Sequence, residues 1–262
     1  MTKQAITTAL ITGASSGIGA TYADRLARRG YDLVLVARDR KRMEALAARL
    51  REETGVAIDI IQADLTDAAD LRRVETRLSE DEQIGLLVNN AGASAAGGLE
   101  GTNADVQDRL IRLNVTAVTR LAAAVVPRFV AKGEGSIINI ASVMAFIPEA
   151  PSGVYSATKA YVLTYSQSLQ EELGPKGLYV QAVLPAATRT EIFERSGIDI
   201  NTFSGLMEVD ELVDAALVGF DRRERVTIPP LHDASQWDAF ETARRAMQPN
   251  FAQEHAAPRY RG

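Results

Sequence analysis

Hydrophobic and polar positions alternate along the chain with two different periods. Short runs rich in Val, Ile and Leu are separated by longer stretches with an apolar residue every three or four positions. The short runs indicate strands that are covered on both faces, and the longer stretches indicate amphipathic helices. The predicted strands are Ala5–Ile11, Tyr31–Ala37, Val56–Gln62, Gly85–Asn89, Gly135–Ala141, Tyr179–Leu184 and Val226–Ile228. The predicted helices are Gly17–Arg29, Arg40–Thr54, Ala68–Glu80, Asn103–Lys132, Ser152–Leu173, Glu208–Arg222 and Asp233–Met247.

This alternation predicts a doubly wound α/β fold of the Rossmann type, with a parallel sheet and helices on both faces. We find no linker, repeat or low-complexity tract, so we expect a single domain over residues 1–262. Two segments depart from the rhythm. Residues 189–209 carry scattered apolar positions and are predicted to form a lid over a substrate. Residues 249–262 lack periodicity, and we expect them to be mobile or to pack against a neighbouring subunit.

Composition excludes several kinds of site. The chain has no cysteine and only two histidines, which excludes disulfides, thiolate metal sites and a histidine-rich metal centre. The net charge of −5 and the lack of a basic tract give no reason to expect a nucleic-acid partner. No uninterrupted apolar run approaches the roughly 18 residues of a membrane helix, and no signal-peptide pattern opens the chain. We therefore expect a cytoplasmic protein without a metal or a membrane partner.

A glycine-rich turn joins the first predicted strand to the first predicted helix. Its glycines, at positions 13, 17 and 19, allow a tight turn and a close approach of the backbone to a ligand. The helix that follows presents free N–H groups and a partial positive charge, which favour a pyrophosphate. The turn therefore predicts a nucleotide site.

The same stretch, Gly13-Ala-Ser-Ser-Gly17, also matches the G-x-S-x-G pattern of a serine hydrolase. That mechanism needs an acidic residue and then a histidine downstream, and only His232 and His255 are available. No strong candidate for an oxyanion loop accompanies the motif. A hydrolase is therefore the less favoured alternative.

The end of the second strand bears on the choice of dinucleotide. An acidic residue there binds the ribose 2′-hydroxyl of NAD, whereas an arginine accommodates the 2′-phosphate of NADP. This chain has Ala37 followed by Arg38, with Arg40 and Arg42 close behind. We therefore expect NADP(H) in preference to NAD(H).

Tyr155 and Lys159 are four residues apart in a predicted helix and so lie on one face. A free phenol has a pKa of about 10. An ammonium group about 4 Å away favours the phenolate by roughly 1–4 kcal/mol. A tyrosine tuned in this way can exchange a proton with an alcohol or ketone oxygen near neutral pH.

With these residues in their order, the chain resembles the short-chain dehydrogenase/reductase family. The resemblance covers roughly residues 5–190. Asp64-Leu65 is similar to the adenine-contacting pair of that family, and Asn89-Asn-Ala-Gly92 to the motif that stabilises its central sheet beside the cofactor. Asn114 and Ser142 match its proton-relay asparagine and catalytic serine. The expected cofactor contacts are Gly13, Ser15, Ser16, Gly17, Ile18, Gly19, Arg38, Asp64, Leu65, Asn90, Ala91, Gly92, Tyr155, Lys159, Pro185, Thr188 and Thr190.

The resemblance also implies a role for each catalytic residue. Tyr155 would be the general acid in ketone reduction and the base in alcohol oxidation. Lys159 would hold the nicotinamide ribose and lower the pKa of the tyrosine. Ser142 would stabilise charge on the substrate oxygen, and Asn114 would hold a water that links Lys159 to solvent. The sequence departs from the family pattern at Ala186, where a glycine usually follows the proline that is Pro185 here.

These expectations combine into an NADP(H)-dependent oxidoreductase that interconverts an apolar or weakly polar ketone or aldehyde with its alcohol. A protein that binds NADP(H) without turnover is the other alternative, although the complete Ser-Tyr-Lys set argues against it. The resemblance implies a homodimer or homotetramer. The predicted substrate pocket is largely apolar and consists of Met144, Phe146, Pro148, Val154, Ile192, Phe193 and Met207.

Overall fold

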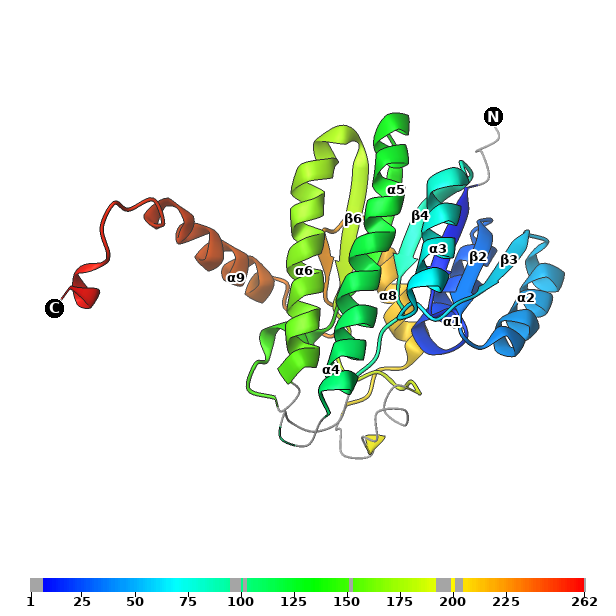
Figure 1. Ribbon diagram of the computed structural model, residues 1–262, viewed down its shortest axis with the longest axis horizontal. Coiled ribbons are helices and arrows are strands. Elements are labelled where there is room, and N and C mark those ends of the chain that lie inside the picture. The colour runs from blue at the N-terminus through cyan, green and yellow to red at the C-terminus, as the bar shows by residue number, and fades with distance from the viewer. Residues whose placement is uncertain are drawn as a thin grey trace. The chain divides into compact units, whose positions relative to one another are not determined.

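The computed structural model describes residues 7–94, 100, 103–150, 153–191, 199–200 and 205–261. Among them, seven parallel strands form one sheet in the order β3-β2-β1-β4-β5-β6-β7 (Figure 1). The order reverses between β1 and β4, which confirms the predicted doubly wound fold. The strands are β1 Thr8–Thr12, β2 Asp32–Ala37, β3 Ile58–Gln62, β4 Ile84–Asn89, β5 Gly135–Ile140, β6 Leu178–Val183 and β7 Val226–Thr227.

Helices cover both faces of this sheet, as the sequence predicted. The helices are α1 Gly17–Arg28, α2 Arg40–Thr54, α3 Ala68–Glu80, α4 Ala104–Ile111, α5 Val118–Lys132, α6 Gly153–Leu173, α8 Val209–Asp221 and α9 Ser235–Ala246. One hydrophobic core contains Tyr22 and Met43 together with Leu217 of α8. The other contains Val74 of α3 and Val125 of α5. Figure 1 shows α3, α5 and α6 side by side on this second face.

The predicted helix Asn103–Lys132 is not uniform. It consists of α4, a π-helical segment η2 at Arg112–Ala117, and α5. The other predicted elements agree with the structure to within a residue or two at most ends, as is usual where helices fray. The wider turn of η2 places Asn114, one of the predicted catalytic residues, at 2% exposure.

The continuous helix from Ala104 to Lys132 is long and apolar enough, by length and composition alone, to cross a membrane. In this fold one of its faces packs against the core, where Leu121, Val125 and Phe129 are buried. The apolar residues on that face are therefore explained by packing against the sheet and α3.

Contacts divide the chain into two units, Met1–Pro229 and Pro230–Gly262. The first unit holds the sheet and every residue of the predicted site. The second unit contains α9 and two short 3₁₀ turns, at Gln248–Asn250 and Pro258–Tyr260. Its side chains Phe240, Phe251 and Tyr260 are exposed. The single domain predicted from sequence stays a prediction.

Candidate active site

The predicted site residues follow the carboxyl ends of neighbouring strands. The glycine-rich turn follows β1, Asn90 follows β4, Ser142 follows β5 and Pro185 follows β6. Because the carboxyl ends of parallel strands meet at one edge of the sheet, the fold gathers these residues where ligands bind in open α/β sheets.

The glycine-rich turn has no room for side chains. Gly13 has φ +67°, and a Cβ there would lie 2.7 Å from Asn90 Nδ2. A Cβ on Gly19 would lie 2.3 Å from the Gly13 carbonyl oxygen. α1 begins at Gly17, so the first N–H groups of this helix are available at the turn. This cradle fits the pyrophosphate of a dinucleotide.

Hydrogen bonds from β4 hold the turn in place. Asn90 Nδ2 donates to the Thr12 carbonyl at 2.9 Å and to the Gly13 carbonyl at 3.3 Å. Thr12 Oγ1 donates to the Val88 carbonyl at 3.3 Å and accepts from the Asn90 and Ala91 N–H groups, each at 3.0 Å. Thr12 opens the stretch Thr12–Gly19 that resembles the cofactor-binding turn of the family, but the sequence did not predict its hydrogen bonds to the segment after β4.

Lys159 is buried at the sheet edge, with 6% of its surface exposed. Its Nζ donates to the Ile140 carbonyl at 2.9 Å and lies 5.7 Å from the centroid of the Tyr155 ring. Burial disfavours the charged form and lowers the pKa of Lys159 to about 8. The predicted helical pairing of the two side chains is therefore present.

The pKa of Tyr155 differs from the expectation. Burial raises it, and a hydrogen bond with Ser142 acts in the opposite direction. The predicted lowering by Lys159 is not seen, and the Lys159 ammonium group bonds to the Ile140 carbonyl. Ser142 Oγ donates its one proton to the Pro185 carbonyl at 3.2 Å and accepts from the Met144 N–H at 3.2 Å, so its position is fixed.

Asn114 joins the loop after β4 to α6. Its Oδ1 accepts from the Ala93 N–H at 3.0 Å, and its Nδ2 donates to the Ala93 carbonyl at 2.9 Å and to Thr158 Oγ1 at 3.1 Å. Thr158 Oγ1 donates to the Tyr155 carbonyl at 2.7 Å. A Cβ on Gly92 would lie 3.3 Å from Asn114 Oδ1 and 3.5 Å from Lys159 Nζ. Asn114 thus lies beside the lysine, and sequence reasoning missed its link to Thr158.

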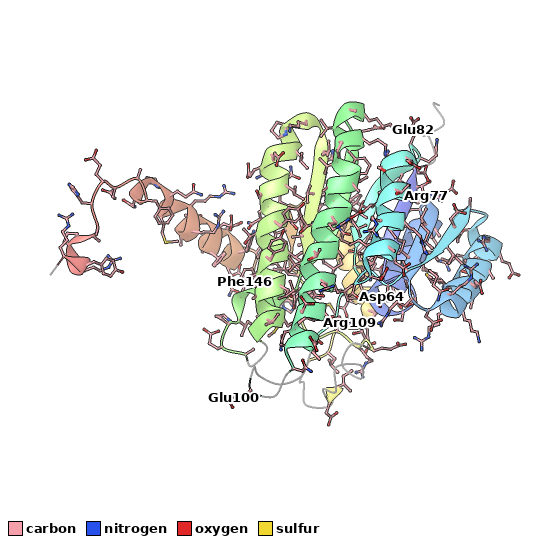
Figure 2. All side chains as sticks on the ribbon, in the orientation of Figure 1. Asp64, Arg77, Glu82, Glu100, Arg109 and Phe146 are labelled. Atoms are coloured by element: carbon pink, nitrogen blue, oxygen red, sulfur yellow. The ribbon has the colours of Figure 1, made fainter. Side chains whose placement is uncertain are left out.

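The residues predicted to hold the adenosine end lie at the ends of β2 and β3. Asp64 Oδ2 accepts from Arg109 at 2.8 Å, and Asp64 Oδ1 accepts from Thr66 Oγ1 at 2.7 Å (Figure 2). Burial would raise the pKa of Asp64, but the Thr66 hydrogen bonds and the charges of Arg109 and Arg38 hold it below its usual value. Leu65 is buried.

Arg38 differs from the two arginines that follow it. Arg40 pairs with Glu44 at 2.7 Å, and Arg42 pairs with Glu191 at 2.6 Å. Arg38 is exposed and has no ion-pair partner within the part of the chain that the structure describes. Its guanidinium group is therefore available for an anionic ligand.

The loop after β6 returns to the glycine-rich turn. Thr188 is buried and its Oγ1 donates to the Ala186 carbonyl at 3.0 Å. Thr190 packs on Gly17, where an added Cβ would lie 3.3 Å from Thr190 Cγ2. Arg189, which had no predicted role, pairs with Glu208 at 2.8 Å.

The structure describes five of the seven predicted pocket residues. Met144 and Phe146 lie in a 3₁₀ turn at Val143–Phe146, directly after Ser142, and both are partly buried (Figure 2 labels Phe146). Val154 and Met207 are also partly buried, whereas Pro148 is exposed. The two remaining residues, Ile192 and Phe193, lie outside the described residues.

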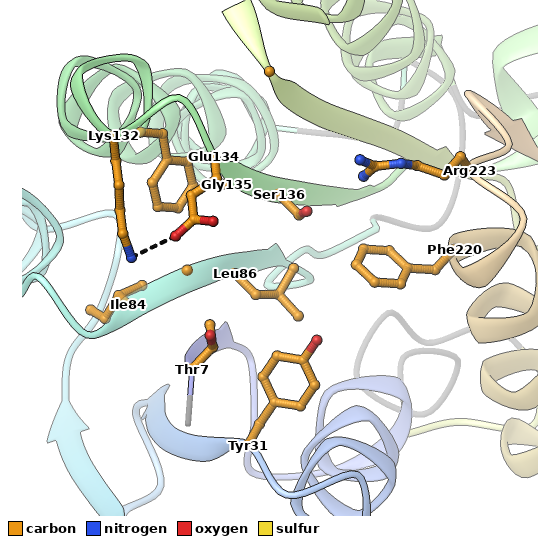
Figure 3. Close-up of a pocket in the computed structure, with 13 residues that line it drawn as sticks. Thr7, Tyr31, Ile84, Leu86, Lys132, Glu134, Gly135, Ser136, Phe220 and Arg223 are labelled. Atoms are coloured by element: carbon orange, nitrogen blue, oxygen red, sulfur yellow. Dashed lines mark ion pairs between the residues drawn. The ribbon is translucent and has the colours of Figure 1, made fainter. Parts of the chain in front are cut away.

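A recess of about 220 Å³ lies at the other edge of the sheet, where the strands begin (Figure 3). Ile84 opens β4, Gly135 opens β5, and both line it. Lys132 and Glu134 form an ion pair at its rim, with a separation of 2.8 Å. This recess is separate from the site described above.

Three comparisons identify relatives. A sequence model of the short chain dehydrogenase family matches residues 7–201. A short-chain dehydrogenase from Sphingobium yanoikuyae, solved in complex with NADPH, is 64% identical with a TM-score of 0.96, over 98% of this chain and 100% of that chain. A bulky-bulky ketone specific alcohol dehydrogenase from Comamonas testosteroni is 59% identical with a TM-score of 0.93, over 99% of this chain and 100% of that one.

More distant relatives include human 17-beta-hydroxysteroid dehydrogenase type 3, which is 32% identical over 80% of this chain and 68% of the relative. The rat very-long-chain 3-oxoacyl-CoA reductase is 36% identical over 70% of this chain, which spans 60% of that protein. The family match covers most of the chain, including the glycine-rich turn and the Ser142, Tyr155 and Lys159 positions. The chain therefore belongs to the short-chain dehydrogenase/reductase family and is an oxidoreductase.

Proposed function

We propose that the protein is an NADPH-dependent reductase of bulky, apolar to weakly polar ketones that also catalyses the reverse oxidation of the alcohols. The observation that carries the proposal is the placement of Ser142, Tyr155 and Lys159 at the sheet edge that also holds the glycine-rich turn. A proton donor and a phosphate cradle at one edge suit a hydride transfer coupled to a proton transfer.

The residues present fit a dinucleotide, because a cradle that any Cβ would fill lies at the start of α1. The bound cofactor would supply the hydride. In reduction, the Tyr155 phenol donates its proton to the substrate oxygen, and Ser142 donates a hydrogen bond that stabilises the charge on that oxygen. Lys159 would hold the ribose hydroxyls of the bound cofactor, and Asn114 lies beside it.

Arg38 supports the preference for NADPH. It is exposed, follows β2 and has no ion-pair partner among the described residues. The relative from Sphingobium yanoikuyae was solved with NADPH. We expect Arg38→Asp to reverse the preference, lowering kcat/KM with NADPH by about 10- to 100-fold because a phosphate contact is lost and repulsion is gained. Steady-state kinetics with NADPH and NADH measure this, with the exposed Arg51→Asp variant as control. An unchanged preference would refute the role of Arg38.

The substrate class rests on two features. The relative from Comamonas testosteroni is described as specific for bulky-bulky ketones. The side chains next to the catalytic serine in this chain, Met144 and Phe146, are apolar. We also propose a cytoplasmic location and assembly as a homodimer or homotetramer. In this proposal Pro185, Thr188 and Thr190 contact the nicotinamide end of the cofactor.

The test is to follow NADPH absorbance with a panel of diaryl, aryl-alkyl and dialkyl ketones. We expect turnover that is abolished in Tyr155→Phe, since the phenol proton is lost while ring packing is kept. Tyr161→Phe on the exposed part of the same helix is the matched control. Equal activity of Tyr155→Phe and wild type would overturn the mechanism. Tight NADPH binding without turnover of any carbonyl compound would instead favour the cofactor-binding alternative.

A further inference from the structure

Three polar side chains form a hydrogen-bonded chain inside the hydrophobic core. Asn89 Nδ2 donates to Asn139 Oδ1 at 2.9 Å, and Asn139 Nδ2 donates to Ser166 Oγ at 2.9 Å. Ser166 Oγ donates in turn to the Val162 carbonyl at 2.7 Å. The exposed fractions of Asn89, Asn139 and Ser166 are 3%, 0% and 1%. Burying polar groups is unfavourable unless each is hydrogen-bonded, and Asn89 Oδ1 has no partner among the described residues. Apolar residues would therefore fill this space at lower cost.

These three hydrogen-bonded side chains lie next to the catalytic residues along β5 and α6. Asn139 precedes Ile140, whose carbonyl accepts a hydrogen bond from the Lys159 ammonium group. Ser166 comes seven residues after Lys159 and lies on the same face of α6. β5 and the residues that follow it therefore contact α6 at three points. Ser142 contacts Tyr155, the Ile140 carbonyl contacts Lys159, and Asn139 contacts Ser166.

The other end of the chain reaches the cofactor cradle. Asn89 and Asn139 are paired residues of β4 and β5. Asn90, the next residue along, holds the glycine-rich turn through the Thr12 carbonyl. A continuous path of hydrogen bonds and one peptide unit thus connects the turn to the catalytic helix.

We propose that Asn139 and Ser166 are positioning residues that set the register of α6 on β5, and thereby the distance of Tyr155 and Lys159 from the cofactor cradle. Apolar packing is non-directional and permits small shifts of a helix along a sheet, whereas a hydrogen bond tolerates little change in length or angle. The proposal rests on the proposed reductase function, in which displacement by about 1 Å can lower a rate by about 100-fold.

The test compares Ser166→Ala, Ser166→Thr and the wild type. Alanine leaves Asn139 Nδ2 without its acceptor, whereas threonine keeps the hydroxyl group. We expect kcat per folded molecule to fall about 10-fold or more in Ser166→Ala, with the NADPH dissociation constant changed by less than about 2-fold and the kcat–pH profile shifted. Ser166→Thr restores kcat. Ser168→Ala, an exposed serine on the same helix, is the matched control and leaves kcat unchanged.

Hydrogen exchange gives a readout that does not depend on turnover. In Ser166→Ala, the amides of residues 155–166 exchange faster than in wild type, while those of α3 are unchanged. If wild type reduces no ketone, the proposed function fails, and exchange together with NADPH binding still tests the positioning role. A Ser166→Ala protein with wild-type kcat and wild-type exchange in α6 would overturn the inference, as would a kcat loss that Ser166→Thr shares in full. Asn139→Ala repeats the test from the strand side.

Discussion

Gly13, Gly19 and Lys159, at the carboxyl ends of the strands, have little free space around them. Gly13 and Gly19 are tied to their positions because no Cβ fits between the turn and Asn90. Lys159 is buried, and its ammonium group donates a hydrogen bond to the Ile140 carbonyl. The chemistry therefore depends on residues whose neighbours leave few acceptable replacements.

Replacing Gly13 by alanine should weaken NADPH binding by about 100-fold or more. The added Cβ clashes with Asn90 Nδ2 and a side chain at φ +67° is strained, so the turn must open. Titration of NADPH fluorescence measures the loss. Gly30→Ala also places a side chain at positive φ, but in open space away from the turn, and serves as control. Wild-type affinity in Gly13→Ala would contradict the assignment of the cradle.

The lowered pKa of Lys159 predicts a pH-dependent stability. The folded protein releases the lysine proton near pH 8, whereas the unfolded chain holds it up to about 10.5. The unfolded state thus binds more protons between these values, and the lysine contribution to stability rises with pH across this window. Relative to wild type, Lys159→Met should gain on the order of 1–3 kcal/mol at pH 7, and the gain should shrink above pH 8. Urea denaturation at several pH values measures the difference, and a constant difference would refute it.

At the scale of helices and strands, ion pairs from Asp24 and Arg25 join α1 to α2 and α8. Asp24 of α1 accepts from Arg28 at 3.0 Å and from Arg49 of α2 at 3.0 Å, and Arg25 pairs with Asp214 of α8 at 2.7 Å. The side chain of Asp24 is only 10% exposed. These contacts join α2 and α8 to α1, the helix that begins at the glycine-rich turn.

Asp24→Asn should destabilise the protein at neutral pH by about 2 kcal/mol. Burial raises the pKa of Asp24, but hydrogen bonds from Arg28, Arg49 and Arg25 outweigh burial and lower the pKa to about 2. A lowered carboxyl pKa contributes stability that is complete above about pH 4 and is lost as pH falls toward 2. Denaturation of both proteins between pH 2 and 7 should show the difference vanish at the acid end. Asp39→Asn, an exposed carboxylate, is the control.

The elements could be predicted from sequence more completely than the contacts among them. The apolar runs and amphipathic stretches predicted the strands, their parallel arrangement and the helices on both faces. Ser142, Tyr155 and Lys159 followed from their order and the family resemblance. Thr158 and Ser166 could not be found in this way, because a single hydroxyl on a buried helix face carries no periodic signal. Their partners depend on how a helix lies on a strand, which spacing along one chain does not determine.

At the scale of the whole molecule, the unit Pro230–Gly262 contrasts with the sheet unit. Phe251 and Tyr260 are each 71% exposed, and among its described residues no apolar side chain is fully buried. Isolated helices as short as α9 are marginal in water. A segment with these properties gains stability by covering its apolar side chains. That residues 249–262 are mobile or pack against a neighbouring subunit stays a prediction.

Phe251→Ser combined with Tyr260→Ser should shift the protein toward smaller assemblies while the sheet stays folded. Removing two large exposed apolar side chains lowers the area that a partner can bury. Sedimentation velocity across protein concentrations measures the assembly, and circular dichroism monitors the fold. An exposed polar change in the same unit, Gln253→Ser, is the control. An unchanged assembly state in the double variant would contradict an interface role for the tail.

The π-helical segment Arg112–Ala117 has a further consequence for how the chain tolerates change. A π turn contains one residue more than an α turn, so it behaves as an insertion that the helix has absorbed. Deleting one residue there would restore a regular helix, but it would rotate α4 by about 100° against α5. Asn114 could no longer face both Ala93 and Thr158. The rotation of α4 relative to α5 therefore depends on the number of residues in this segment. Substitutions there are tolerated more readily than any change in length.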